Sequence, residues 1–233
     1  VTLGALPVTA TGVLPGVLTR LRIQHPGLTV RLQQGRTEDL LPALAIGEID
    51  LIVGRLYQPA VPDGFDRHPL WAEPISVLAR TGHPLFEQPQ ATIEALRQYE
   101  LVLPTVTQRV GQEIEHLLAL LKLGPDMPLR SSSYGFIREM LLSTDLISVM
   151  PRLMMVGDLL RGTLRVVTLP IDAPPRPAGL ILDPSRPLSA AARGFVACLT
   201  VYIQELTQRG LAPITPGYID GAQSNTTLPS LPD

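Results

Sequence analysis

The first 53 residues alternate between short apolar runs and longer segments in which apolar residues recur every three or four positions. The apolar runs are predicted strands at Val1–Ala5, Leu28–Gln33 and Asp50–Val53. The segments between them, Gly12–His25 and Thr37–Ile46, are predicted amphipathic helices. The order strand, helix, strand, helix, strand indicates right-handed crossovers and an open parallel sheet.

Open parallel sheets bind ligands at the carboxyl ends of their strands, beside the N-termini of the following helices. In this chain those ends are Leu6–Thr9, Gly35–Thr37 and Gly54–Arg55. The third strand is apolar, as in a strand that is buried on both faces of such a sheet. We therefore expect a ligand-binding site along these three turns.

The alternation of strands and helices starts again after a predicted strand at Glu73–Arg80. Further strands are expected at Phe65–Trp71, Leu101–Leu103, Leu129–Ser131, Leu146–Met150, Leu164–Leu169 and Ala178–Leu182. Further helices are expected at Thr92–Arg97, Gly111–Leu123, Tyr134–Leu142, Leu153–Leu160 and Ser189–Arg209. Two series of this kind, each too short for a large sheet, predict an α/β protein with two lobes.

The expected first lobe consists of residues 1–78 and 179–210, and the second of residues 79–178. The chain would cross between the lobes twice, which makes a hinge, and the last helix would return to pack on the first lobe. Residues 211–233 show no hydrophobic period, so we expect an extended or disordered tail.

Composition narrows the classes of function. The chain has 233 residues, 45% of them hydrophobic, which is enough for well-filled cores. A formal net charge of -2 and the lack of a Lys and Arg stripe argue against a surface for nucleic acid. Pro, Gly or charged residues interrupt every apolar stretch before it reaches membrane-spanning length. The single cysteine, Cys198, excludes an internal disulfide and is expected in the core.

The sequence begins with Val1, which is already inside a predicted strand. We therefore expect a preceding segment. A secretory signal there would place the protein outside the cytoplasm, whereas another domain would not, and the residues alone leave both open.

The residue patterns contain no constellation that would support catalysis. Glu113 and His116 are one helical turn apart, but no second such pair follows, and a lone pair on an exposed face is normally solvated. Ser131–Ser133 lack the Gly-x-Ser-x-Gly elbow of a nucleophilic serine, and Gly-rich phosphate motifs are missing. We expect neither enzymatic activity nor a cofactor nor a metal site.

Several short motifs follow one another in order between residues 1 and 209. They are Leu3–Pro7, Leu14–Pro15, His25–Gly27, Gly47–Leu51, His83–Leu85 and Val149–Pro151. Each is weak alone, but together and at this spacing they resemble the effector-binding domain of LysR-type transcriptional regulators. Gly4–Pro7 combined with Gly54–Leu56 and Ser143–Asp145 is most similar to the branch of galactose-binding-protein regulators and protocatechuate-catabolism regulators.

The resemblance implies a cytoplasmic bacterial regulator with two Rossmann-like lobes, joined by a two-crossing hinge as in type 2 periplasmic binding proteins. A small-molecule inducer, either a carboxylate from aromatic catabolism or a monosaccharide, would bind between the lobes. The winged helix-turn-helix would lie upstream of Val1, so DNA would be contacted only through that absent domain. The family forms antiparallel homodimers and then tetramers, without a membrane segment, and by analogy Gly12–His25 would lie at the dimer contact. Asp145-Leu146 replaces a Gly common in the family, which would reshape one cleft wall.

Two candidate site residues in the first lobe have alternative interpretations. Thr37 begins a predicted helix, so it would either cap that helix or direct its hydroxyl at a ligand, and the family places an effector-contacting Ser or Thr here. Arg55 at the end of the third strand suits a bidentate carboxylate contact. Alternatively, Arg55 would form an ion pair with Glu38 or Asp39.

The turn after the first strand supplies Pro7, Val8 and Thr9. Its backbone N–H groups and the Thr9 hydroxyl would bind a carboxylate or a sugar hydroxyl. Pro7 offers no N–H, and Val8 occupies a position that often carries a hydroxyl in the family. One side-chain hydrogen bond to the ligand is therefore expected to be missing.

The second lobe contributes the remaining candidates, which are Thr105, Thr107, Arg109, Ser133 and, through the family motif, Met150. Helix capping alone would explain most of the hydroxyls, but a ligand between two lobes must also contact the second one. A periplasmic solute-binding protein is the competing hypothesis, with the same fold and cleft. An upstream signal peptide and a monomeric state would favour transport, whereas an upstream helix-turn-helix and a homodimer would favour regulation.

Overall fold

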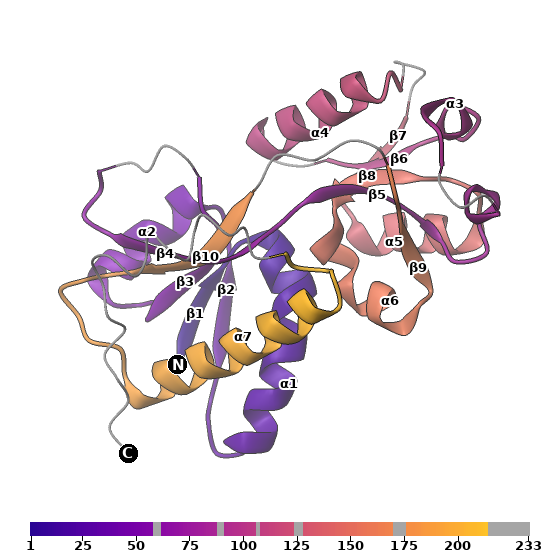
Figure 1. Ribbon diagram of the computed structural model, residues 1–233. Helices are drawn as coiled ribbons and strands as arrows, with labels where there is room; N and C mark the ends of the chain where they lie inside the picture. Colours follow the sequence, from indigo (N-terminus) through magenta and orange to yellow (C-terminus); the bar gives the residue numbers. More distant parts are fainter. Residues whose placement is uncertain (58–61, 88–90, 106–107, 124–127, 170–175, 214–233) are drawn as a thin grey trace. The chain divides into compact units, whose positions relative to one another are not determined.

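The computed structural model describes residues 1–57, 62–87, 91–105, 108–123, 128–169 and 176–213, without the side chains of residues 108 and 109. The chain forms two compact units, unit 1 from residues 1–73 and 175–233 and unit 2 from residues 74–174 (Figure 1). Both are built from strands and helices. The boundary expected at residue 78 falls inside strand β5 (Ile75–Arg80), which lies whole in unit 2. Only residues 211–213 of the expected tail are described.

Unit 1 is built on a five-stranded sheet with the strand order β2-β1-β3-β10-β4. Its elements are β1 (Thr2–Ala5), the π-helix η1 (Thr9–Val13), α1 (Leu14–Gln24), β2 (Arg31–Gln34), α2 (Thr37–Ile46), β3 (Leu51–Arg55), β4 (Asp66–Ala72), β10 (Pro177–Leu182) and α7 (Ala190–Gln208). Strand β1 pairs in parallel with β2 and β3, as predicted. Strand β10 is antiparallel to both β3 and β4, so the sheet of unit 1 is mixed.

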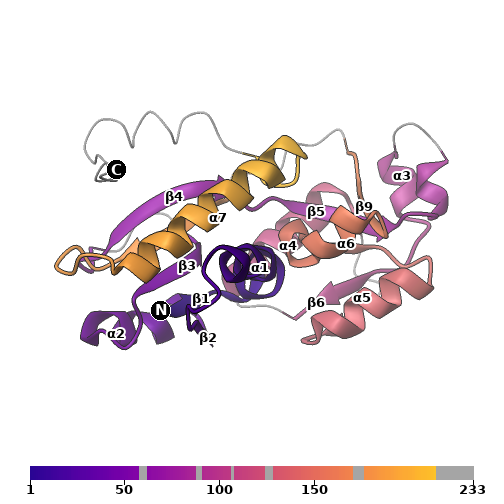
Figure 2. The same cartoon turned by 90° about the horizontal axis from the view of Figure 1, so that it is seen from below.

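Helices cover both faces of the unit 1 sheet. Helix α2 buries Leu40 and Leu44 against Ile52 of β3 and Ile181 of β10. Helices α1 and α7 lie side by side on the other face (Figures 1 and 2). The apolar face of α7, which includes Phe195, is buried there. The long helix near the C-terminus therefore packs on unit 1, as expected from the two-lobe organisation.

Unit 2 contains an antiparallel sheet of order β8-β5-β9 and a parallel pair β6-β7, joined by a bridge between Leu101 and Ile147. Its elements are β5, the 3-10 helix η2 (Pro84–Phe86), α3 (Ile93–Leu96), β6 (Val102–Pro104), α4 (Gln108–Leu120), β7 (Leu129–Ser131), α5 (Tyr134–Ser143), β8 (Ser148–Pro151), the 3-10 helix η3 (Arg152–Met155), α6 (Val156–Arg161) and β9 (Leu164–Val167). Helix α4 lies on one side of these strands and α5 and α6 on the other (Figure 1). Alternate residues of β5 and β8, such as Val77 and Val149, enter the core that α4 completes.

The ends of several elements follow from local chemistry. The hydroxyls of Thr92, Ser133 and Ser189 accept hydrogen bonds from backbone N–H groups and cap α3, α5 and α7. Gly162 ends α6 in the left-handed conformation, with φ 72°. Among the described residues, no helix is both long and apolar enough to cross a lipid bilayer.

Several predicted elements differ from the structure in their bounds, and two of them lie at the start of unit 1. The second strand begins at Arg31, not at Leu28, because its pairing with β1 starts only opposite Thr2. The first helix begins before Gly12, because the chain already turns into a π-helix at Thr9. Both differences arise from pairing and backbone geometry that hydrophobic spacing does not encode.

Candidate ligand-binding site

The turns after β1, β2 and β3 lie at one edge of the unit 1 sheet. The Leu6 N–H donates to the Val53 carbonyl at 3.1 Å, and the Gly35 N–H donates to the Ala5 carbonyl at 3.1 Å. These bonds continue the parallel ladders for one residue beyond the strands. The three turns singled out by the sequence are therefore adjacent, as expected for the carboxyl ends of parallel strands.

Thr37 is the first residue of α2 and not its cap. Arg36 occupies the N-cap position and provides no side-chain cap. The Oγ1 atom of Thr37 is shielded from solvent and has no hydrogen-bond partner among the described residues. The capping alternative therefore does not apply. Because an unsatisfied buried hydroxyl costs about 1–3 kcal/mol, a ligand that supplied its partner would recover that energy.

Charged side chains surround the start of α2. The Arg36 Nε lies 2.7 Å from Asp39 Oδ2, and its Nη1 lies 3.4 Å from Glu38 Oε1. The hydrogen bond from Arg36 lowers the pKa of the Asp39 carboxyl. Two carboxylates and one guanidinium leave this turn with a net negative charge, which weakens the attraction of the helix N-terminus for an anion. A ligand here would depend on hydrogen bonds to the Thr37 hydroxyl and to backbone N–H groups.

The segment after β1 turns directly into a helix. Pro7 and Val8 are partly buried and lie before the π-helix, a geometry that often occurs at functional sites. Thr9 is fully buried, and its hydroxyl donates to Glu73 Oε1 at 3.4 Å. Glu73 is also fully buried. The Thr9 hydroxyl thus secures the turn from inside unit 1, and contact between this turn and a ligand stays a prediction.

Gly54 brings the end of β3 close to the first turn. Its φ is 151°, and a Cβ at this position would lie 2.7 Å from the Leu6 Cβ and 3.2 Å from the Thr9 Oγ1. Only glycine fits this approach. The neighbouring Arg55 donates from Nη1 to the Pro177 carbonyl at 3.3 Å, and its guanidinium lies 5.6 Å from the centre of the Tyr57 ring.

The acidic residues proposed as alternative partners of Arg55 are both in contact with Arg36. Arg55 is partly buried at the end of β3, and its guanidinium lies by the Pro177 carbonyl and the Tyr57 ring. A carboxylate contact by Arg55 stays a prediction.

Unit 2 has an equivalent edge at the ends of β6 and β7. The Thr105 N–H donates to the Ser131 carbonyl at 2.8 Å, and the Ser133 hydroxyl accepts from the Phe136 N–H at 3.2 Å. Thr105 and Ser133 therefore follow neighbouring parallel strands, although the hydroxyl of Ser133 caps α5. Met150 is fully buried in β8. Thr107 and the side chain of Arg109 lie outside the described part of the chain.

The buried Glu73 and the partly buried Arg152 are charged residues that were not among the candidates from the sequence. Glu73 lies beneath Thr9, and Arg152 directly follows β8. The sequence offered only their positions at the ends of predicted strands. Within the described residues, His, Cys, Asp and Glu side chains nowhere gather in a group of three or more that could hold a metal ion.

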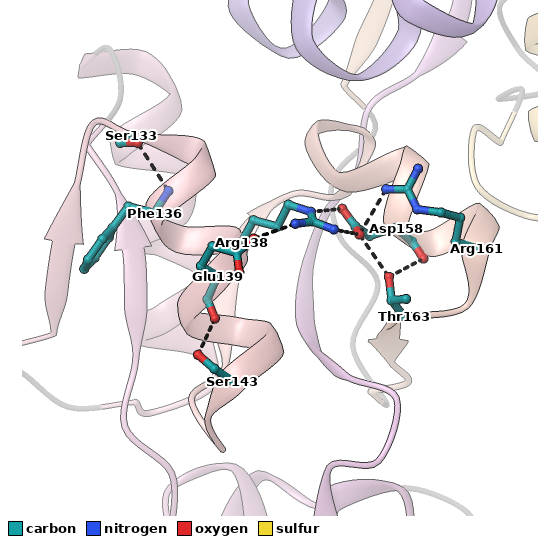
Figure 3. A network of polar contacts seen from close by, with 8 residues as sticks. All are labelled: Ser133, Phe136, Arg138, Glu139, Ser143, Asp158, Arg161 and Thr163. Carbon is teal, nitrogen blue, oxygen red and sulfur yellow. Dashed lines mark hydrogen bonds and ion pairs between the residues drawn. The ribbon is translucent and has the colours of Figure 1, made fainter.

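A polar network in unit 2 joins α5 to α6 (Figure 3). The Asp158 carboxylate accepts two bonds of 2.8 Å from Arg138, one of 3.1 Å from Arg161 and one of 2.9 Å from the Thr163 hydroxyl. Burial opposes ionisation of Asp158, but the hydrogen bonds from Arg138, Thr163 and Arg161 outweigh it and lower the pKa of the carboxyl. The carboxylate is well satisfied, so we assign this network to the stability of unit 2.

Comparison with known proteins places this fold in a family. The model of the LysR substrate binding domain matches residues 1–202. The chain is 29% identical over 195 residues to the HTH-type transcriptional regulator PcaQ of Agrobacterium fabrum, covering 81% of this chain and 62% of that protein. It is 27% identical over 203 residues to the HTH-type transcriptional regulator GalR of Pseudomonas putida, covering 87% and 51%. The chain thus spans about half to three-fifths of the length of these relatives.

A solved structure supports the same fold. The BenM effector binding domain with its effector benzoate superimposes with a TM-score of 0.65 and 19% identity, covering 91% of this chain and 93% of that one. The matched family is the substrate binding domain of LysR-type regulators and not an enzyme. The motif-based prediction is confirmed: this chain belongs to the LysR substrate-binding domain family.

Proposed function

We propose that this chain is the effector-sensing part of a bacterial DNA-binding transcriptional regulator, and that the Thr37 hydroxyl contacts the effector directly. The observation that carries the proposal is the buried Thr37 Oγ1, which has no partner among the described residues and lies where three parallel strands end. Burying a hydroxyl lowers the stability of the fold unless a hydrogen-bond partner compensates for the lost water. An effector with a hydrogen-bonding group would do so.

The effector contacts that we propose come from both units. Around Thr37 they are Pro7, Val8, Thr9 and Arg55, and in unit 2 they are Thr105, Thr107, Arg109, Ser133 and Met150. Thr9 would contribute its backbone, since its hydroxyl is turned towards Glu73. The adjacency of the strand-end turns within each unit supports this set.

We propose that the effector is a small carboxylate or a monosaccharide. The BenM domain, which shares this fold, binds benzoate. A carboxylate would use the guanidinium of Arg55. A sugar would rely more on the Thr37 hydroxyl and on backbone groups.

Effector binding would alter the arrangement of the two units and of the dimer, and thereby the DNA-binding part of the full-length regulator in the cytoplasm. A ligand shifts such an equilibrium only if it binds one state more tightly than the other.

Strand β2 lies at the edge of its sheet with all four residues exposed, and Leu32 is 44% exposed. Ile23 at the end of α1 is 77% exposed. These residues suit a homodimer contact, with tetramers in the full-length protein.

The dimer is tested by sedimentation of the purified domain at micromolar concentration. Wild-type protein should sediment as a dimer, and Ile23→Glu should shift it towards monomer without a change in helix content. A wild-type monomer at this concentration would contradict the proposed assembly.

The effector proposal is tested by thermal unfolding of the domain with a panel of small carboxylates and monosaccharides. A ligand at 100 times its dissociation constant should stabilise the folded state by about 2.7 kcal/mol. Thr37→Val should reduce that stabilisation to about 1.4 kcal/mol or less, because a ligand bound 10-fold more weakly is then present at only about 10 times its dissociation constant. The matched control is Thr200→Val on α7, which removes a hydroxyl bonded to the Val196 carbonyl at 2.9 Å and should keep the shift. An equal shift in all three proteins would exclude Thr37 as a contact.

A further inference from the structure

Arg152 follows the last residue of β8 and begins η3. Its backbone N–H donates to the Pro74 carbonyl at 3.2 Å, which fixes the residue to the chain just before β5. Its side chain is partly buried, and its Nε is shielded from solvent. The backbone of Arg152 is therefore fixed beside β5, and its guanidinium is partly buried in unit 2.

The guanidinium has no counterion in the described part of the chain. Its Nε finds no acceptor there, and neither a hydrogen bond nor an ion pair joins its side chain to another described residue. Burial alone lowers the pKa of this guanidinium, with no contribution from a nearby carboxylate. Taking a cation out of water without a partner is costly.

The other arginines of unit 2 whose side chains are described all have a partner. Arg80, Arg130, Arg138 and Arg161 contact carboxylates, Arg97 donates to the Lys122 carbonyl, and Arg165 lies 4.1 Å from the centre of the Phe86 ring. Arg152 differs from all of them, although it is less exposed than Arg161. A partner supplied from outside the chain would remove this difference.

We propose that Arg152 is a further residue of unit 2 that binds the effector, and that it recognises a carboxylate. The inference rests on the proposed function, and it decides between the two effector classes in favour of the acid. A guanidinium presents parallel N–H donors that match the two oxygens of a carboxylate, and an anion also supplies the missing charge. A neutral sugar would satisfy the donors but leave the partly buried charge unpaired.

The test compares wild-type domain with Arg152→Met and Arg152→Lys by thermal shift and calorimetry. The probes are benzoate, shikimate and other small carboxylates, each paired with its neutral amide, and galactose. Arg152→Met should weaken carboxylate binding about 10- to 150-fold, the loss expected for hydrogen bonds to a charged group. Arg152→Lys should recover part of the affinity, because it restores the charge but not the two parallel donors. Arg165→Met is the matched control and should bind like wild type.

The outcomes separate this inference from the proposed function. Binding of an acid that depends on both Thr37 and Arg152 supports both. The role of Arg152 is overturned if binding depends on Thr37 but is equal in wild type and Arg152→Met, or if only galactose or an amide binds. Either result leaves the effector proposal intact. The lack of any shift at millimolar concentrations overturns both. The unliganded Arg152→Met protein should unfold at the same temperature as wild type or higher, since it no longer buries an unpaired charge.

Discussion

Replacement of Asp158 by Asn should destabilise unit 2. The Asp158 side chain is only 5% exposed, and its carboxylate accepts two hydrogen bonds of 2.8 Å from Arg138. Asn keeps the shape but removes the charge and turns an amide donor towards these donors. Each hydrogen bond to a charged group contributes about 1.5–3 kcal/mol, but Arg138 and Arg161 are 35% and 60% exposed and can turn to water. The expected loss is therefore about 2 kcal/mol in total.

That loss should appear as a fall of roughly 4–8 °C in the unfolding temperature of the domain. The matched control is Glu139→Gln, because Glu139 contacts the same Arg138 but is 70% exposed, and it should change stability by less than about 0.5 kcal/mol. A double-mutant cycle with Arg138→Met isolates the coupling between Asp158 and Arg138. A coupling energy near zero, or Asp158→Asn as stable as wild type, would refute the role assigned to this network.

Three further changes test other parts of the fold. Gly179→Ala should prevent unit 1 from folding, because a Cβ there would lie 1.9 Å from a carbonyl oxygen of β4. The control is Gly64→Ala, which has open space around it and should lower the free energy of unfolding in urea by only about 1 kcal/mol. The hydrogen bond from Arg67 lowers the pKa of Asp63. The stability contributed by the ionised Asp63 carboxylate should therefore be complete at pH values above its unfolded pKa of about 3.9, and it should be lost as the pH falls through the lower folded pKa. Asp63→Asn should remove this part of the acid dependence of unfolding. Ser148→Ala should leave the unfolding temperature unchanged or raise it, since the buried Ser148 Oγ has no partner among the described residues; a clear fall would show a contact.

Much of the local structure could be predicted from the sequence. Apolar spacing gave the bounds of α2 and β7 as they are observed, and the caps at Thr92 and Ser133 follow from their hydroxyls. The adjacency of the turns after β1, β2 and β3 followed from the parallel order alone. These features depend on residues close together in the chain.

The rest depends on contacts between residues far apart in sequence. Strand β10 enters the unit 1 sheet antiparallel, between β3 and β4, and apolar spacing carries no strand direction. The burial of the Thr9 hydroxyl against Glu73 follows from a π-helix that the spacing did not indicate. That Arg152 has no counterion among the described residues could be recognised only after the other described arginines of unit 2 had been assigned partners.

The most direct test of the account is the affinity of wild-type and Thr37→Val protein for the same effector, measured by calorimetry. We expect Thr37→Val to bind at least 10-fold more weakly, the loss of one hydrogen bond of about 1.4 kcal/mol. Its unliganded form should be as stable as wild type or more stable, because the buried hydroxyl has no partner among the described residues. Equal affinity in the two proteins would contradict the effector site proposed at the start of α2. A large loss of unliganded stability would show instead that the hydroxyl is structural.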